Sequence, residues 1–341
     1  MIREIQKDIY QIEVVLPNNP LKILNAYLIK GKDRNLLIDT GFAKKESYES
    51  LLRGLDKLNI DMKKTDVFLT HLHNDHISLV KYIIEDNCKV YMHPLDQKAL
   101  RLLNDKAVWK SDEQFNEKMG FPKGRIGEAL SSFRDLKEIE KQPKEFIYED
   151  IFEDDIIKVG EYEFKCILTP GHTPGHCCLY EENNKILIGG DLILDKITPN
   201  ISLNNKQWLA NPLEAYIDSL NKVKKLQIDI ILPSHRNCIN GAKSRIEELK
   251  EHSYKRLEEV MRALQAKHIS CPYDLAGCMN WNIRARSWEE FPLTQKFFAL
   301  GETMANLVYL ESKGLVERDI IQGKIYFSIS TIGLSVLSNK A

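Results

Sequence analysis

The chain has 341 residues, which exceeds one typical domain, so we expect a main domain with an appended second one. Its 48 Lys and Arg residues are balanced by 49 Asp and Glu residues, giving a formal net charge of -1 without the basic excess typical of nucleic-acid-binding proteins. Without a signal-peptide core, an apolar run of roughly 18 residues or a disulfide framework among its seven cysteines, the chain is expected to be cytoplasmic, with reduced thiols and no membrane segment.

The first ninety residues predict alternating strands and helices. Two apolar segments, 25–29 and 36–39, are separated by the turn Lys30-Gly31-Lys32-Asp33 and predict a hairpin. Leucines at helical spacing predict a helix over residues 45–58. The remaining predictions for this part are strands over 67–70 and 89–92 and a helix over 77–86.

Residues 95–150 are polar and helix-prone, and they predict a helical insert between two strand-rich halves. Strand character returns afterwards at residues 162–168, 177–181, 186–189 and 228–232. A helix is predicted at about 212–225, before the last of these strands. The insert carries aromatic and apolar residues that either close over a substrate pocket or pack among themselves: Trp109, Phe115, Met119, Phe121 and Phe133.

The pattern changes again near residue 244, so we expect a catalytic domain over 1–243 and a C-terminal domain over 244–341. Helices over 244–267 and 293–313, followed by a hairpin, predict a small winged-helix-like unit. Winged helices often bind DNA, but residues 245–341 carry 13 Lys and Arg against 12 Asp and Glu, too few cations for neutralising phosphates. Packing, homodimer formation or pocket support is the expected role, although Arg284, Arg286 and Trp288 could reach an anionic substrate.

Four potential metal ligands lie within six residues directly after the strand predicted at 67–70. They are His71, His73, Asp75 and His76. A regular helix or strand would spread them over several faces, whereas a tight loop at a strand end can aim all four inward. Imidazole and carboxylate are ligands that zinc, iron and manganese accept. A set of surface histidines is the alternative, and the number and order of the ligands argue against it.

Three later strand ends also present ligand-type residues. Two Pro-Gly pairs make a rigid turn around His172, an apolar strand ends in Gly189-Gly190-Asp191, and His235 follows another strand. Close backbone approach explains the glycines, and Asp191 could bridge two cations. His176 opens the next strand and is expected to support the site through hydrogen bonds rather than bind metal. Each cluster alone is weak, and their repetition predicts one metal centre.

The ordered set, His-x-His-x-Asp-His followed by a Pro-Gly-His turn, Gly-Asp and a late His, resembles the metallo-beta-lactamase superfamily. Within it, the glyoxalase II-like hydrolases use the same ligand types. The resemblance covers about residues 10–240 and implies an α+β fold, a four-layer αββα sandwich. It implies one metal position formed by His71, His73 and His172. It implies a second position formed by Asp75, His76 and His235, with Asp191 bridging the two.

The resemblance also implies a supporting aspartate. Leu37-Ile38-Asp39-Thr40-Gly41 matches the strand-end aspartate of the family, so Asp39 is expected to brace the ligand loop, an ordinary turn carboxylate being the alternative. One departure from the family is that Ile77-Ser78-Leu79 follow the Asp-His pair, where small residues are common.

The function expected from this ligand set is hydrolysis. Two divalent ions, with zinc as the default and iron or manganese fitting the same ligands, would share a hydroxide, since such ions lower the pKa of water from about 15.7 to about 7. Asp75 and Asp191 would orient the hydroxide and pass a proton to the leaving group. The expected substrate is a small molecule with an ester-like bond, such as a thioester or lactone.

Other functions remain open at this point. The alternatives within enzymes are an RNA or phosphodiester hydrolase and a mononuclear iron dioxygenase. A flavo-diiron oxidoreductase, a metal-dependent regulator and a β-lactam-degrading enzyme fit less well, because the chain lacks a flavodoxin pattern, has a complete ligand set and has no export signal.

Overall fold

The computed structural model describes residues 1–341 except 104, 131–138, 204–208, 284 and 339–341. Phe133 and Arg284, named above, therefore lie outside the described residues. The chain forms two compact units. The first comprises Met1–Arg101, Leu136–Pro199 and Ser219–Ile246, and the second comprises Leu102–Asp135, Asn200–Asp218 and Glu247–Ala341.

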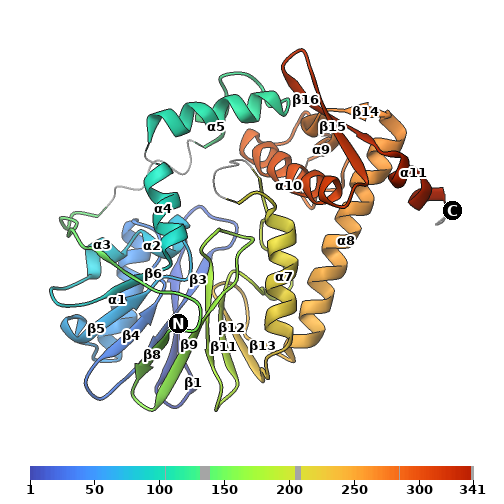
Figure 1. Ribbon diagram of the computed structural model, residues 1–341. Helices are drawn as coiled ribbons and strands as arrows, with labels where there is room; N and C mark the ends of the chain where they lie inside the picture. The colour runs from blue at the N-terminus through green and yellow to red at the C-terminus, as the bar shows by residue number, and fades with distance from the viewer. Residues whose placement is uncertain (104, 131–138, 204–208, 284, 339–341) are drawn as a thin grey trace. The chain divides into compact units, whose positions relative to one another are not determined.

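The first unit contains two β-sheets (Figure 1). The first sheet is built, in spatial order, from β1 (Ile2–Gln6), β2 (Ile9–Val15), β3 (Ile23–Ile29), β4 (Asn35–Ile38), β5 (Thr65–Phe68), β6 (Val90–Met92) and β7 (Tyr148–Asp150). Neighbouring strands are antiparallel up to β4 and parallel from β4 to β7. The predicted hairpin is confirmed as β3 and β4.

The second sheet is built, in spatial order, from β13 (Ile239–Asn240), β12 (Ile230–Pro233), β11 (Ile186–Gly190), β10 (Cys177–Glu181), β9 (Tyr162–Leu168) and β8 (Ile156–Val159). Only the β11–β12 pair among these described strands is parallel. One buried cluster holds side chains of both sheets, including Phe68 from the first and Phe164 from the second. The main core of the unit therefore lies between the two sheets.

Helices cover the outer faces of both sheets. In β4, Leu36 and Ile38 point into the core between the sheets, whereas Leu37 points the other way and joins Leu51 and Leu55 of α1 (Lys45–Lys57) in a second cluster. On the other side, residues 219–224 of α7 (Pro212–Lys224) bury Leu220 and Val223. The layers are thus helix, sheet, sheet and helix, which confirms the expected α+β, αββα sandwich.

Two predicted elements differ from the structure. The helix expected over 77–86 is broken into α2 (Asn74–Ile77) and α3 (Val80–Ile83), because the amide of the buried Leu79 donates to Gly41 O at 3.1 Å instead of continuing one helix. The segment 95–150 is not wholly a helical insert, because its last residues form β7 and extend the first sheet beside β6. The remaining short helices of this part are a 3-10 turn at Met62–Lys64 and α4 (Pro94–Leu103).

The second unit combines helices with a small sheet. Helix α8 (Ala242–Lys267) leads into it, and its other elements are α5 (Lys106–Lys118), α6 (Ile126–Ala129), α9 (Pro272–Ala276), α10 (Leu293–Ser312), α11 (Thr331–Ser338), β14 (Ile269–Ser270), β15 (Val316–Ile321) and β16 (Lys324–Ile329). The sheet has the order β14-β16-β15. The helices predicted over 244–267 and 293–313 and the hairpin after them are confirmed as α8, α10 and β15–β16.

Part of the segment predicted as a lid packs inside this second unit. The Phe121 ring lies 6.0 Å from Tyr273 and 5.9 Å from Phe297, measured between centroids, and the Tyr273 amide donates to Met119 O. This supports the packing alternative for Met119 and Phe121. The Trp288 ring likewise contacts Tyr273 edge to face, with 5.3 Å between the ring centroids. Within the described ranges, no helix combines the length and apolar character that a membrane span requires.

Candidate metal centre

The segment that follows β5 turns its four candidate ligands into one small space. His73 precedes the single helical turn α2, and Asp75 and His76 lie in that turn. The prediction of a loop without helix was therefore wrong for this pair. One turn is nevertheless sufficient, because consecutive helical residues diverge by only about 100°, and Asp75 Oδ2 lies 3.8 Å from His76 Nε2. His71 Nε2 and His73 Nδ1 are 3.0 Å apart.

All seven predicted ligands belong to three overlapping clusters. Within each cluster, one nitrogen or oxygen atom per residue lies within 4.8 Å of the others. The clusters are His71 with His73 and His172, His71 with His76 and Asp191, and Asp75 with His76 and His235. The structure thus brings together residues from four strand ends that are far apart in the sequence, at distances that suit shared metal ions.

Asp191 stands between the clusters. Its Oδ2 lies 3.7 Å from His76 Nε2 and 3.6 Å from His172 Nε2, and its Oδ1 lies 3.6 Å from His235 Nε2. The side chain is buried, and the two oxygens are directed toward different histidines. A carboxylate in this position can contribute an oxygen to each of two neighbouring cations.

The electrostatics of the cluster favour bound cations. Burial and neighbouring imidazoles lower the pKa of His71, and burial and the nearby His172 lower the pKa of His73 to about 3. Burial also disfavours the charged form of His76, but the carboxylates of Asp39, Asp75 and Asp191 outweigh it and raise its pKa to about 10. One side of the site therefore holds neutral imidazoles, and on the other side carboxylates surround His76 and favour a positive charge there, either its own proton or a bound cation.

Unsatisfied polar atoms test whether metal ions fit. Among the described residues, the buried atoms His76 Nε2, Asp191 Oδ1 and His235 Nε2 have no hydrogen-bond partner. Buried polar atoms without a partner are costly and rare in proteins, and a coordinated cation satisfies them. Once His76 and His235 have lost their Nε2 protons, all three atoms are lone-pair donors of the kinds that divalent metals accept. The residues present therefore fit the metal ions that the sequence leads one to expect.

Asp39 supports the ligand loop from behind. Its carboxylate is fully buried and accepts hydrogen bonds from Thr70 N (2.9 Å), Thr70 Oγ1 (2.8 Å), Ser234 Oγ (3.0 Å) and His76 Nδ1 (2.7 Å). Its φ of +58° is left-handed, which Asp tolerates better than most residues. Asp39 thus lies beside the candidate ligand His76 and the start of the candidate ligand loop. No sequence pattern singled out Thr70 or Ser234, although each directly precedes a predicted ligand.

His176 uses both ring nitrogens in hydrogen bonds. Its Nδ1 pairs with Thr169 Oγ1 at 2.8 Å, and its Nε2 accepts from the Asp191 amide at 3.0 Å. No ring nitrogen of His176 is left for a metal, and its Nε2 is paired with the backbone of Asp191. The close approach also explains Gly190, with φ of +52°, because a Cβ there would lie 2.5 Å from His176 Nε2.

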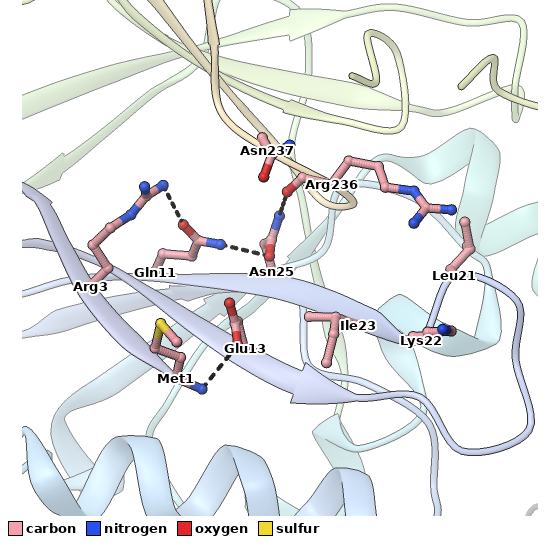
Figure 2. Close-up of a pocket in the computed structure, with 10 residues that line it drawn as sticks. All are labelled: Met1, Arg3, Gln11, Glu13, Leu21, Lys22, Ile23, Asn25, Arg236 and Asn237. Atoms are coloured by element: carbon pink, nitrogen blue, oxygen red, sulfur yellow. Dashed lines mark hydrogen bonds and ion pairs between the residues drawn. The ribbon is translucent and has the colours of Figure 1, made fainter. Parts of the chain in front are cut away.

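The strand β3 and its neighbours fix the loop that carries His235. His235 Nδ1 lies 2.9 Å from Ile23 O, and the side-chain Nδ2 of Asn25 donates to Pro233 O (3.0 Å) and Arg236 O (2.8 Å). Figure 2 shows Asn25 and Arg236 in the wall of a separate hollow of about 390 Å³, lined by residues of β1 to β3 and of this loop. The β3 contacts on both sides of His235 hold its Nε2 toward the cluster.

One buried carboxylate near the site had no signal in the sequence. Asp96 of α4 is fully buried and accepts hydrogen bonds from Leu72 N (2.9 Å), Thr173 Oγ1 (2.7 Å) and Gly175 N (2.6 Å). Burial raises the pKa of the Asp96 carboxyl to about 7, and the three hydrogen bonds oppose this shift. Its partners lie on the two loops that carry His71, His73 and His172.

Comparison with known proteins gives a consistent result. The model of the metallo-beta-lactamase superfamily matches residues 21–235. The probable metallo-hydrolase YqjP of Bacillus subtilis (strain 168) is 24% identical over 314 residues, which cover 88% of this chain and 92% of that protein. Acyl-coenzyme A thioesterase MBLAC2 of Gallus gallus is 26% identical over 228 residues, which cover 64% of this chain and 74% of that protein.

A solved structure supports the same fold. The metallo-beta-lactamase family protein TTHA1429 from Thermus thermophilus superposes with a TM-score of 0.80, covering 95% of this chain and 100% of that one at 24% identity. At this level of identity the match shows the fold alone.

Proposed function

Because this chain belongs to the metallo-beta-lactamase superfamily, we propose that it is a hydrolase that uses two divalent metal ions to cleave an ester-like bond in a small molecule. The observation that carries the proposal is the gathering of seven histidine and aspartate side chains from four strand ends into overlapping clusters. A single-metal enzyme would need only one of these clusters. The presence of Asp75, His76 and His235 as a complete second group therefore favours two metal positions over a mononuclear iron dioxygenase.

The proposed division of ligands follows the clusters. His71, His73 and His172 would hold one ion and Asp75, His76 and His235 the other, with Asp191 shared, as in a glyoxalase II-like ligand set. Zinc is the proposed metal, and iron or manganese accepts the same donors. Ions bound there lower the pKa of water from about 15.7 to about 7 and polarise an oxygen of the substrate.

The two carboxylates next to the histidines have a second proposed role. Asp75 Oδ2 lies 3.4 Å from His235 Nε2, and Asp191 Oδ1 lies 3.6 Å from the same atom, so both carboxylates face one small volume. An attacking water there would be oriented by these oxygens. One of them can accept a proton from the water and deliver it to the leaving group.

A thioester or lactone is the proposed substrate class. The similarity to a protein named acyl-coenzyme A thioesterase supports it, and so does the balanced charge of 48 basic and 49 acidic residues, which lacks the basic excess that binding to a polyanion such as RNA favours. We also propose a cytoplasmic location, a domain boundary near residue 243 and a winged-helix-like C-terminal domain that supports packing or a homodimer.

The test is a substrate panel on metal-replete protein. Wild-type protein, Asp191→Ala and the control Asp229→Ala, whose carboxylate is 72% exposed, would be assayed with acyl-coenzyme A thioesters, lactones and phosphodiesters. We expect thioester or lactone hydrolysis by the wild type and the control, and none by folded Asp191→Ala. Undiminished turnover by Asp191→Ala, turnover of phosphodiesters alone, or oxygen uptake by an iron-loaded protein would contradict the proposal.

A further inference from the structure

Asp96 connects the loop that carries His71 and His73 with the loop that carries His172. It lies in the first turn of α4, and its Oδ2 accepts both from Leu72 N at 2.9 Å and from Thr173 Oγ1 at 2.7 Å. Its Oδ1 accepts from Gly175 N at 2.6 Å. Two of these donors are backbone amides, which can only donate, so the site requires two acceptor oxygens on the side chain of residue 96.

The partners of Asp96 stand directly beside candidate ligands. Leu72 lies between His71 and His73, and Thr173 follows His172. The rings of His73 and His172 lie only 4.5 Å apart, measured between centroids, although the two residues are distant in the chain. One carboxylate therefore bridges the two loops whose histidines form the first cluster.

The close packing around Asp96 leaves little freedom for the two loops to separate or slide. A Cβ at Gly175 would lie 2.6 Å from Asp96 N and 2.9 Å from Asp96 Oδ1, so the loop reaches the carboxylate only because residue 175 is glycine. The Asp96 amide in turn donates to His93 O at 3.0 Å, which fixes the start of α4. The carboxylate is thus held by its own backbone as well as by its three donors.

The other cluster is held by different contacts. His76 is oriented by Asp39, and His235 by Ile23 O, at 2.7 Å and 2.9 Å. The two proposed metal positions therefore differ in their supports: Asp39 and β3 hold the second, Asp39 also reaches His71 through Thr70, whose hydroxyl lies 3.0 Å from His71 Nδ1, and the hydrogen bonds of Asp96 run to the loops of the first.

We propose that Asp96 is the positioning residue of the metal position formed by His71, His73 and His172, and that it sets the affinity of that position without setting that of the other. This inference rests on the proposed two-metal function. Residues that orient metal ligands through hydrogen bonds typically contribute about 10- to 100-fold to metal affinity.

The Asp96→Asn variant tests the inference with a minimal change of shape. The new side-chain amide would have to present its Nδ2 to a donor, Leu72 N–H or Gly175 N–H, and the repulsion would push one loop away. We expect the affinity of one metal position to fall about 10- to 100-fold while the other is unchanged. Thr173→Val, which removes one hydroxyl at constant volume, should lower the same affinity by a smaller factor.

Metal binding by full-length, metal-free protein would be measured by calorimetric titration with Zn²⁺, and the geometry of the position by the visible absorption spectrum after Co²⁺ substitution. The matched control is Asp66→Asn, because Asp66 also accepts a backbone amide, Lys89 N at 2.8 Å, and pairs with Arg34, away from the cluster. The control should lose stability but keep both affinities and the wild-type Co²⁺ spectrum.

The outcomes separate this inference from the proposed function. Two wild-type affinities in folded Asp96→Asn, or an equal loss at both positions, would overturn the role of Asp96 and leave the two-metal site intact. A wild-type protein that binds no Zn²⁺ would instead overturn the proposed function. If Asp96→Asn does not fold, the Thr173→Val variant tests the inference instead. Unchanged Zn²⁺ affinities at both positions in Thr173→Val would contradict it.

Discussion

Replacing Asp39 by Asn should weaken metal binding by His76, although His76 itself is unchanged. The Oδ1 of Asp39 accepts from Thr70 N, so in Asp39→Asn the amide oxygen would keep that bond and Nδ2 would take the place of Oδ2. Nδ2 would then face His76 Nδ1, which lies 2.7 Å from Oδ2 in the wild type. To accept from Nδ2, the imidazole must move its proton to Nε2, the atom directed at the cluster, and it then has no lone pair for a metal.

The size of the effect follows from the bond at stake. His76 can keep its metal-binding tautomer only by giving up the hydrogen bond to residue 39. A hydrogen bond to a charged group contributes about 1.5–3 kcal/mol, and about 1.36 kcal/mol corresponds to a tenfold change. We therefore expect the affinity of the position formed by Asp75, His76 and His235 to fall about 10- to 150-fold. The fold should survive, since Asn tolerates the φ of +58°.

The assay is a calorimetric titration of metal-free Asp39→Asn protein with Zn²⁺. Thermal unfolding checks that the variant is folded. Asp229→Asn, at an exposed carboxylate, is the control for the chemical change. Wild-type affinity at both positions in a folded Asp39→Asn protein would refute the assignment of His76 Nε2 as a ligand atom.

Two further predictions concern packing and metal removal. Gly190→Ala should lower stability by about 1–3 kcal/mol through overpacking against His176 and should reduce turnover. Gly124→Ala is the control, because residue 124 also has a positive φ but has no atom within 4 Å of the new Cβ, so it should lose only the smaller free energy due to backbone strain. Chemical denaturation measures both losses, and equal losses of unfolding free energy in the two variants would contradict the overpacking at Gly190. Free metal at a thousand times its Kd should stabilise the protein by about 4 kcal/mol per position. For a domain of this size that raises Tm by on the order of 10 °C, and an unchanged Tm after chelation would contradict metal binding at the cluster.

Much of the first unit was accessible from local sequence patterns. The hairpin of β3 and β4, the helix α1 and the strands β9 to β11 follow from short-range periodicity and turn residues. The break between α2 and α3 does not, because it arises from a contact between Leu79 and Gly41, which are distant in the sequence. Strand β7, with three residues, is too short to show any period.

The candidate ligands could be predicted because their side chains are chemically distinctive and each group follows a strand. Apart from Asp39 and His176, the residues that support them could not. Ser234 reaches Asp39 across 195 positions, and Asp96 reaches Gly175 across 79. Serine, threonine and aspartate are common in loops, so nothing local marks a residue that hydrogen-bonds a distant ligand loop. Only the three-dimensional arrangement identifies them.

Hydrolysis by two metal ions acting together can be tested directly by one measurement. Metal-free full-length protein would be reconstituted with increasing Zn²⁺, and its metal content by elemental analysis would be compared with its rate of thioester or lactone hydrolysis. We expect both to level off together at about two ions per chain, as a paired-ion site requires. Saturation at one ion, or hydrolysis that persists in the metal-free protein, would contradict the account.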